Sequence, residues 1–529
     1  MVRPEYITTS HGQIRIWWAG SGPSLVAIAG LTGSAASLAA ELTATFPHRR
    51  VLVLEPPGIG GSADSGTDSL VTASAAVTEA LTFLGVQAFD LLAYEMSAAL
   101  VPAVLAGLPH QPSKTVLLEF GRARAWAQTQ TSPPDLSSRS DGTHLNALWT
   151  FLRDRRLLRP EDPTLPSGSG AALPEEDELS DAFVAAAVSP EYFATAWEMC
   201  AEGLSAVSEL GSVRYAESTA MLADSLDTRG PGEESSSGVP STRPAAGSRI
   251  WHQYVETEFG RAHLRRAGSE GRPILVLPTG GGSSAQFAPV ISGLAADRMV
   301  VAVDYFGNGL SDKTVRDVTI AILAREAIAV LDALGLDEVD VWGSHTGACV
   351  ALELAISFPE RVRKIVMEGP VMVTPEFRDE LLANYFPDFA PDKFGLHIQH
   401  LWHWRRDMFM YWPWYSVDWS STRQLGVPRA EELHKYAVGI LESGTTYSGA
   451  YRAGFSYDTW SRLPLLHRKA ILTAGPNDML ANALEDATQV APDGMLKIHK
   501  TPTTMWWPDP EPEAAAETLA LYRDFLGSV

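Results

Sequence analysis

The sequence predicts two α/β modules in tandem, each built on a mostly parallel, doubly wound β-sheet. The first observation is that short apolar runs, such as 51–54, 274–277 and 300–303, alternate with helical patterns such as 324–335. Strands without polar alternation are typical of parallel sheets covered by helices on both faces. The second is a length of 529 residues, which exceeds what one domain normally needs. The third is an internal repeat.

The first half of the chain recurs in the second half in the same order. VLVLEPPGIGGS (51–62) matches VVAVDYFGNGLS (300–311). Residues 134–154 share Pro, Asp, Gly, His, Leu, Trp and Arg at identical spacing with residues 387–407. Chance agreement over that spacing is remote, and a repeat of this kind predicts a tandem duplication.

The repeat also sets the predicted boundaries. The first module covers 1–227, and a Gly-, Ser- and Pro-rich segment over 228–249 reads as a linker. The second module covers 250–529 and contains an aromatic-rich cap at about 371–462. The first module has no evident counterpart of the later strand-like runs near 469–475 and 495–500, so we expect it to be truncated.

Composition limits the partners. The formal charge of −22 repels nucleic acid phosphates and anionic lipid surfaces, so neither nucleic acid nor a membrane is expected as a partner. Cys200 and Cys349 are the only cysteines, too few for a disulfide framework or a clustered metal site. The N-terminus has no apolar signal-like region and no stretch is apolar enough to span a bilayer. We therefore expect a cytoplasmic protein with a small-molecule substrate.

Three motifs of the second module resemble the α/β-hydrolase superfamily. VDVWGSHTGACVALELA (339–355) resembles its strand–turn–helix elbow, with Gly343 and Gly347 flanking the turn. VVAVDYFGNGLSDK (300–313) resembles its Asp-x-x-Gly-x-Gly-x-Ser loop, and ILVLPTGGGSSAQF (274–287) stands where its oxyanion loop follows a strand. The resemblance covers most of both modules. It implies backbone N–H donors for an oxyanion, for which the matching residues are Thr279, Gly280 and Thr346.

The elbow residue departs from the family pattern. The turn carries His345 in the second module and Glu95 in the first, where the family has a nucleophile. Ser344 is adjacent but points elsewhere, and Met505 stands near the position of the family's closing histidine. A Ser-His-Asp triad is therefore not encoded.

His345 can still act as a general base. The N-terminus of the following helix disfavours the imidazolium form, which leaves a basic ring nitrogen. An acid must orient the ring, and the two family acid positions hold Glu368 and Asp478. We expect Glu368 as the partner because its longer side chain can reach from the adjacent strand. The alternative is an inactive copy whose histidine only fills the turn.

A second histidine is shared by both copies. His397 and its counterpart His144 stand at predicted helix starts in the cap regions. His397 is therefore a candidate catalytic residue, and a structural role is the equal alternative. His397, His400 and His403 are spaced by three, which spreads their rings over about 300° of a helix, so no metal site is expected.

The aromatic segment 401–419 predicts a pocket wall. Some of its rings should line the cleft, because so many cannot all be buried inside a short cap. The candidate substrate-binding residues are Trp402, Tyr411, Trp412, Trp414 and, from the opposite wall, Trp506. The glycine-rich loop 278–283 lacks both the P-loop lysine and dinucleotide spacing, so no nucleotide cofactor is expected.

The leading functional hypothesis is a cofactor-independent enzyme that acts on a small hydrophobic or aromatic substrate, with His345 as general base. Lyase, dehydratase or isomerase chemistry fits this base. Hydrolysis by an activated water is the alternative within enzymes. A third hypothesis is a non-catalytic small-molecule-binding or scaffold protein. The first module is expected to pack on the second as an internal pseudo-dimer partner, and homo-oligomerisation is left open.

Overall fold

The structure is a computed structural model that divides into two compact units. Unit 1 is Met1–Pro244 with Pro391–Leu396, and unit 2 is Ala245–Ala390 with His397–Val529. The residues described are 2–63, 65, 68–155, 157–159, 162–166, 173–207, 210, 213–231, 239, 250–313, 316–423, 425–506 and 509–527. Most of the predicted linker 228–249 lies outside these ranges.

Unit 1 contains a seven-stranded sheet in the order β1-β2-β4-β3-β5-β6-β9. β2 pairs antiparallel with β1 and β4, and the remaining neighbours are parallel. The strands are β1 (Arg3–Thr9), β2 (Gly12–Ala19), β3 (Ser24–Ile28), β4 (Arg50–Leu54), β5 (Phe89–Tyr94), β6 (Thr115–Leu118) and β9 (Val213–Ala216). A separate hairpin pairs β7 (Leu158–Arg159) with β8 (Asp162–Pro166).

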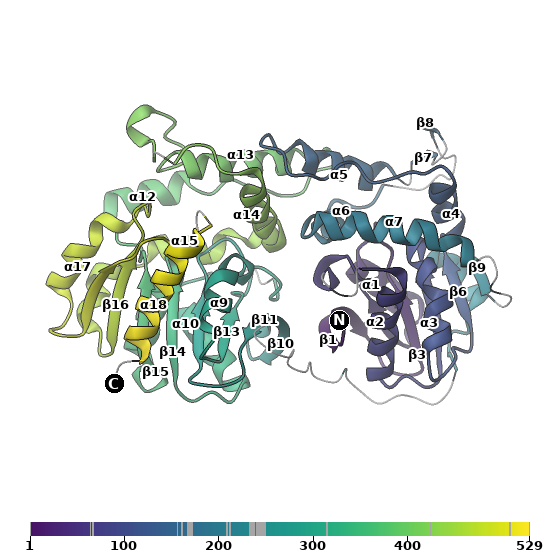
Figure 1. Cartoon of the computed structure of the whole chain (residues 1–529), viewed down its shortest axis with the longest axis horizontal. Coiled ribbons are helices and arrows are strands. Elements are labelled where there is room, and N and C mark those ends of the chain that lie inside the picture. Colours follow the sequence, from purple (N-terminus) through teal and green to yellow (C-terminus); the bar gives the residue numbers. More distant parts are fainter. Residues whose placement is uncertain are drawn as a thin grey trace. The chain divides into compact units, whose positions relative to one another are not determined.

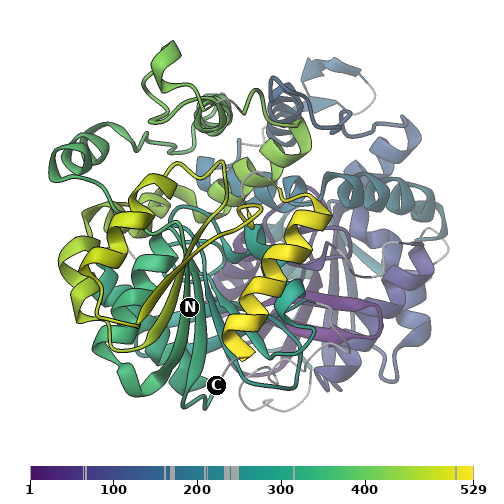
Figure 2. The ribbon, with the colours of Figure 1, turned by 60° about the vertical axis from the view of Figure 1, so that its left-hand side comes forward.

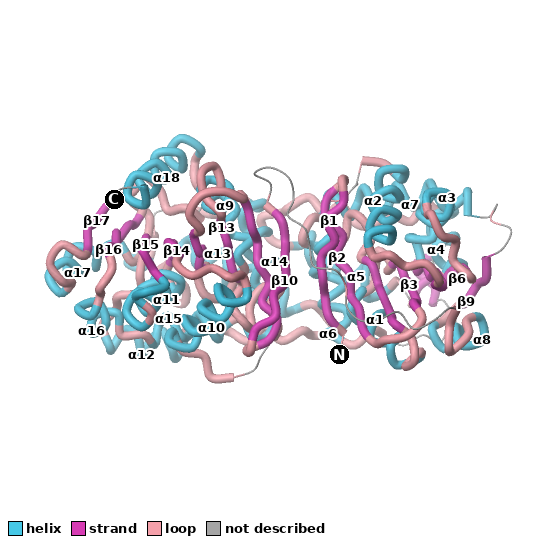
Figure 3. The backbone as a smooth tube through the Cα atoms, turned by 90° about the horizontal axis from the view of Figure 1, so that it is seen from below, coloured by secondary structure: helices cyan, strands magenta, loops and turns pink. Residues whose placement is uncertain are grey.

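Helices cover both faces of this sheet, with α1 and α8 on one side and α2 and α3 on the other (Figure 3). This is the doubly covered arrangement that the uninterrupted apolar strands predict. The helices of unit 1 are α1 (Ala35–Thr45), α2 (Leu70–Phe83), α3 (Val101–Gly107), α4 (Phe120–Gln128), α5 (Thr143–Asp154), α6 (Glu176–Ala187), α7 (Pro190–Val207) and α8 (Leu222–Ser225).

Unit 2 contains an eight-stranded sheet in the order β10-β11-β13-β12-β14-β15-β16-β17. Only the pairings of β11 with β10 and β13 are antiparallel. The strands are β10 (Trp251–Thr257), β11 (Gly260–Ala267), β12 (Ile274–Leu277), β13 (Val300–Val303), β14 (Val339–Ser344), β15 (Val362–Glu368), β16 (Lys469–Ala474) and β17 (Leu496–Lys500). Both sheets confirm the predicted mostly parallel α/β class.

The helices of unit 2 form two groups. In the first, α9 and α18 lie on one face of the sheet and α10 and α11 on the other (Figure 3). This group comprises α9 (Ala288–Leu294), α10 (Ile320–Ala333), α11 (Thr346–Ser357), α17 (Leu484–Val490) and α18 (Pro512–Gly527).

The second group is a helical insertion between β15 and β16. Its helices α12, α13 and α14 lie beyond one end of the strands (Figures 1 and 2). The insertion comprises α12 (Pro375–Asn384), α13 (Leu396–Met410), α14 (Ala430–Ser443), α15 (Ser448–Ser456) and α16 (Thr459–Arg462). Among the described helices of both units, none is long and apolar enough to cross a membrane.

One expectation about the first module is wrong. The sequence showed no counterpart of the strand near 469–475, yet β9 pairs with β6 in unit 1 as β16 pairs with β15 in unit 2. β9 is short, and two of its four residues are exposed, so it has no apolar run that would reveal it. Within the described part of unit 1, the sheet ends at β9 and has no strand beyond it like β17.

A buried Arg–Asp pair recurs in both sheets. Arg49 Nη1 lies 2.9 Å from Asp90 Oδ2 in unit 1, and Arg298 Nη1 lies 2.7 Å from Asp340 Oδ2 in unit 2. Asp340 also accepts hydrogen bonds from Nε and Nη2 of Arg363. Because the Asp340 side chain is fully buried, its charge depends on these donors.

We predict that Asp340→Ala destabilises the protein by about 3–5 kcal/mol, because it leaves the guanidinium of Arg298 buried without its counter-ion. Chemical denaturation measures the free energy of unfolding. Asp332→Ala is the matched control, since it removes a carboxylate that pairs with Arg361 and is 60% exposed. That control should cost about 0–1 kcal/mol. Equal losses in both variants would contradict the assigned role of Asp340.

Candidate active site

His345 occupies a strained turn between β14 and α11. Its φ of 49° and ψ of −106° are unusual for a residue with a side chain, and such strain clusters at functional sites. A Cβ at Gly343 would lie 2.1 Å from the carbonyl oxygen of Gly347, and one at Gly347 would lie 2.1 Å from that of Leu277. The two glycines therefore allow the sharp turn that lifts His345 above the sheet.

The ring of His345 pairs with Asp478, which follows β16. His345 Nε2 lies 3.2 Å from Asp478 Oδ2, and the two side chains are 13% and 0% exposed. Burial raises the pKa of Asp478, but the charge and hydrogen bond of His345 and the N–H of Leu480 outweigh it and hold that pKa below its usual value. Asp478 is therefore a carboxylate, which can only accept, so Nε2 carries the hydrogen.

The expectation that Glu368 orients His345 is wrong. Glu368 ends β15, directly beside Ser344 in the sheet register, and its Oε1 accepts the Ser344 hydroxyl at 3.2 Å. Its Oε2 accepts the N–H of Met505 at 3.1 Å and the hydroxyl of Tyr522 at 3.0 Å. These partners hold the carboxyl group at the strand end, away from the Nε2 hydrogen bond.

Gly369 leaves the room that the His345–Asp478 pair occupies. It has a φ of 51°, and a Cβ there would lie 2.4 Å from Asp478 Oδ2 and 2.8 Å from His345 Nε2. Any side chain at this position would separate the two groups. The choice of Asp478 over Glu368 thus depends on a glycine that follows the β15 strand.

Glu368 has a shifted pKa next to this pair. Burial, and after it the negative charge of Asp478, raise the pKa of Glu368 to about 7. The hydrogen bonds from Met505 and Tyr522 oppose the shift without cancelling it. Glu368 is thus a fully buried carboxyl that changes protonation near neutrality. Its side chain accepts the Ser344 hydroxyl, and its backbone carbonyl oxygen accepts the N–H of His345 at 2.9 Å.

The predicted aromatic residues fall into different environments. The Trp506 ring lies edge-on to the His345 ring at a centroid distance of 5.6 Å. Trp402 is fully buried on α13, whereas Tyr411, Trp412 and Trp414 are partly exposed. Of these five, Trp506 is the ring that contacts the His345–Asp478 pair.

Helix α15 lies against the predicted oxyanion residues. A Cβ at Gly280 would lie 2.3 Å from the Tyr451 Cα, and one at Gly454 would lie 2.5 Å from Thr346 Oγ1. Thr279 and Thr346 are both buried. The role of these backbone groups as oxyanion donors stays a prediction.

His397 is not a member of the His345–Asp478 pair. It is buried in the first turn of α13. Its counterpart His144 is fully buried at the start of α5, where Nδ1 accepts the backbone N–H of Arg139 at 3.2 Å. That bond joins the helix start to the preceding loop, which is the structural role expected as the alternative.

The elbow of unit 1 has a similar positive φ, but its side chain is a carboxylate held by neighbouring side chains. Glu95 has a φ of 51° and is fully buried. Its Oε2 accepts the Thr32 hydroxyl at 2.6 Å, its Oε1 lies 3.7 Å from Arg155 Nη2, and Arg155 also donates to Thr32. The carboxylate at this elbow is thus neutralised internally.

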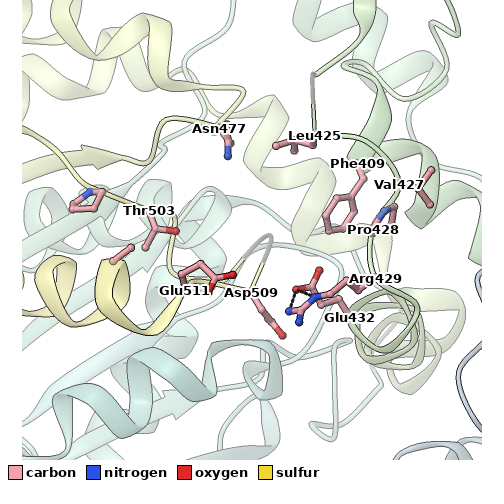
Figure 4. Close-up of a pocket in the computed structure, with 12 residues that line it drawn as sticks. Phe409, Leu425, Val427, Pro428, Arg429, Glu432, Asn477, Thr503, Asp509 and Glu511 are labelled. Carbon is pink, nitrogen blue, oxygen red and sulfur yellow. Dashed lines mark hydrogen bonds and ion pairs between the residues drawn. The ribbon is translucent and has the colours of Figure 1, made fainter.

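The structure has a cavity of about 390 Å³ whose lining includes neither His345 nor Asp478. Asn477, which precedes Asp478, is part of its wall, and Phe409, Leu425, Thr503, Asp509 and Arg429 also line it (Figure 4). None of the five aromatic residues predicted to bind substrate lines this cavity. Among the described residues, no group of three His, Cys, Asp or Glu side chains is placed to hold a metal ion.

Sequence reasoning missed several neighbours of the pair. Tyr522 of α18 bonds Glu368, and Arg423 donates to the backbone of Asn477. Both lie far along the chain from the residues they contact and belong to no motif. A sequence alone gives no signal for such pairings.

Comparisons with known proteins agree with the α/β fold. The family described as alpha/beta hydrolase fold matches residues 272–407. A protein named as a carbamate hydrolase, RutD, from Caulobacter sp. (strain K31) is 35% identical over 215 residues, which are 40% of this chain and 74% of that protein. The 2-hydroxymuconate semialdehyde hydrolase of Pseudomonas sp. (strain CF600) is 34% identical over 162 residues, 29% of this chain and 54% of that protein.

Solved structures with a similar fold include epoxide hydrolase A from Mycobacterium thermoresistibile. Its TM-score is 0.42 at 19% identity, and the match covers 52% of this chain and 98% of that chain.

We predict that Glu368 makes the protein less stable as pH rises through neutrality. Between its ordinary pKa of 4.5 and its raised pKa of about 7, the folded state binds the proton more tightly than the unfolded state. The stabilisation is present below pH 4.5 and is lost as pH rises through 7, by about 3 kcal/mol at most.

Unfolding measured from pH 5 to 8 tests this, and Glu368→Gln should flatten the dependence because an amide does not titrate. Glu376→Gln, at an exposed position on α12, is the control and should keep the wild-type slope. An unchanged slope in Glu368→Gln would contradict the assignment.

Proposed function

The chain belongs to the α/β-hydrolase family, and we propose that unit 2 is a hydrolase in which His345 and Asp478 activate water in place of a serine nucleophile. The hydrogen bond between His345 Nε2 and Asp478 Oδ2, at an elbow of φ 49°, is the observation that carries the proposal. Asp478 follows β16, at the position where the family places an acid. The histidine, normally on a separate loop, here occupies the elbow itself.

The tautomer determines the role of each atom. Because Asp478 accepts the hydrogen on Nε2, the lone pair of the ring is on Nδ1. Nδ1 takes a proton from water as the water oxygen attacks the carbonyl carbon of the substrate. The resulting imidazolium is stabilised by Asp478 and returns the proton to the leaving group. The bond that breaks joins the carbonyl carbon to that group, so all atoms and charges balance.

The relatives favour hydrolysis over the lyase type of reaction. The relatives are named as hydrolases of a carbamate and of a semialdehyde. A His–Asp pair serves proton abstraction from water as well as from carbon, so the pair by itself fits both reactions. We place hydrolysis first and expect one solvent oxygen atom in the product.

Unit 1 is proposed to have no catalytic role. Its elbow carboxylate is bound to Thr32 and Arg155, so it offers no free base to a substrate. The elbow of unit 2 differs from that of unit 1 in this respect. The side chain of His345 is instead 13% exposed.

We predict that His345→Ala lowers kcat/KM for p-nitrophenyl acetate by about 10²- to 10⁴-fold, which is the usual cost of losing a general base. Asp478→Asn should also lower it, because the amide presents the wrong donor to Nε2. Glu95→Ala is the matched control at the other elbow and should retain most activity.

Isotope labelling separates the reaction types. In H₂¹⁸O the acetate formed should carry one solvent oxygen, and a burst of p-nitrophenolate equal to the enzyme concentration should be absent. A stoichiometric burst would show a covalent acyl-enzyme and contradict direct attack by water. Full activity in His345→Ala would remove the proposal altogether.

A further inference from the structure

Arg423 of the helical insertion bonds the residue that precedes Asp478. Arg423, in the segment between α13 and α14, donates to the carbonyl oxygens of Met408 at 2.6 Å and Asn477 at 2.9 Å. Asn477 directly precedes Asp478, and the charge of Arg423 contributes to the lowered pKa of Asp478. Arg423 therefore bonds the residue before Asp478 and acts electrostatically on the Asp478 carboxylate.

Two tyrosine hydroxyl groups of the same insertion meet. The hydroxyl oxygens of Tyr385 and Tyr451 are 3.2 Å apart. Burial raises the pKa of both phenols, and the positive charges of Arg405 and Arg423 oppose that shift in both. Both arginines thus act electrostatically on the same pair of hydroxyls.

Tyr451 also connects this cluster to the glycine-rich loop. Its Cα would be 2.3 Å from a Cβ at Gly280, and its ring atom Cδ1 would be 2.9 Å from one at Gly281. Tyr451 is partly exposed, whereas Tyr385 is buried. Tyr451 therefore packs its backbone and ring edge on the loop, while its hydroxyl bonds that of Tyr385.

Arg405 packs its guanidinium group against the rings of Trp404 and Tyr436. It is buried on α13, with its guanidinium carbon 5.5 Å from the Trp404 ring centroid and 5.7 Å from that of Tyr436. Tyr436 lies edge-on to Trp506 at 6.0 Å, and Trp506 lies edge-on to His345. An aromatic wall thus runs from this arginine to the catalytic ring.

The charge of this cluster contrasts with the rest of the chain. The whole protein has a formal charge of −22, so a pair of neighbouring cations is a local feature. In the part of the chain that the structure describes, the hydrogen bonds of Arg423 go to backbone carbonyls, and no carboxylate forms an ion pair with it. Its planar guanidinium has five donors, of which these two bonds use only part.

Arg423 bonds a residue of the cavity wall, because its partner Asn477 lines that cavity. The other partner, Met408, directly precedes the lining residue Phe409 (Figure 4). Two carboxylates of the cavity are neutralised by cations, Glu432 by Arg429 and Asp509 by Lys435. A third carboxylate, Glu511, also lines the cavity.

We propose that Arg423 and Tyr451, backed by Arg405, bind the carboxylate of an organic-acid substrate and position its hydrolysable bond over His345. Guanidinium groups bind carboxylates through paired hydrogen bonds, which fixes orientation as well as charge. This inference rests on the proposed function for the bond that is cleaved. The binding step itself needs no turnover and can be tested separately.

Calorimetric titration of the full-length protein with benzoate tests the binding step. Benzamide is the neutral comparison of equal shape, and inorganic phosphate is the other anionic probe. We expect benzoate to bind at least tenfold more tightly than benzamide or phosphate. Arg423→Gln should weaken benzoate binding by about 10- to 100-fold, the range for loss of a charged hydrogen bond. Benzamide binding should not change.

Two further variants keep the result interpretable. Arg406→Gln is the matched control, because Arg406 adjoins Arg405 on α13 but pairs with Asp407 and is 30% exposed. It should bind benzoate as the wild type does. Tyr451→Phe removes only a hydroxyl and should weaken benzoate binding with an unchanged melting temperature, which covers the case in which Arg423→Gln does not fold.

His345→Ala separates this inference from the proposed function. It should retain benzoate binding while losing esterase activity. Retained activity in that variant would contradict the proposed function and leave the binding result standing. Equal affinity for benzoate and benzamide, tighter binding of phosphate, or unchanged benzoate affinity in both Arg423→Gln and Tyr451→Phe would each overturn the carboxylate site.

Discussion

The site of unit 2 depends on one constraint, which is the close approach of backbone atoms around the elbow. Glycines at 343 and 347 allow the turn to pack against the end of β12, and Gly369 allows the ring of His345 to reach Asp478. A side chain at any of the three would collide with backbone or with the pair itself. The strain at His345 is therefore maintained by positions that carry no side chain and no chemistry of their own.

Sequence patterns predicted much of the fold because they report local physics. Uninterrupted apolar strands indicate burial on both faces, and the small-residue turn after 339–344 indicates an elbow, so the class and the place of His345 followed from them. Strand β9 was not predicted because an edge strand with two exposed residues has no uninterrupted apolar pattern. The Arg298–Asp340 pair was not predicted because Arg298 lies in the bend before β13 and Asp340 on β14, so the two residues meet only in the folded structure.

The carboxylate that pairs with His345 could not be predicted from the sequence. Both Glu368 and Asp478 stand at the carboxyl ends of strands, and side-chain length favoured the glutamate. The structure decides otherwise, because Glu368 is committed to Ser344, Met505 and Tyr522. Two of these three partners come from segments more than a hundred residues away. Reach along a sheet can be inferred from sequence, but competition from distant donors cannot.

The two elbows show how the same backbone supports opposite chemistry. Glu95 and His345 share a positive φ near 50°, so strain alone does not distinguish them. The two elbows differ in the side chains that contact the elbow residue. Arg155 and Thr32 surround a carboxylate in unit 1 and neutralise it, whereas a single carboxylate opposes one nitrogen of an imidazole in unit 2. An imidazole has a second nitrogen, so pairing orients it without consuming its basicity, and this asymmetry leaves a base at one elbow and none at the other.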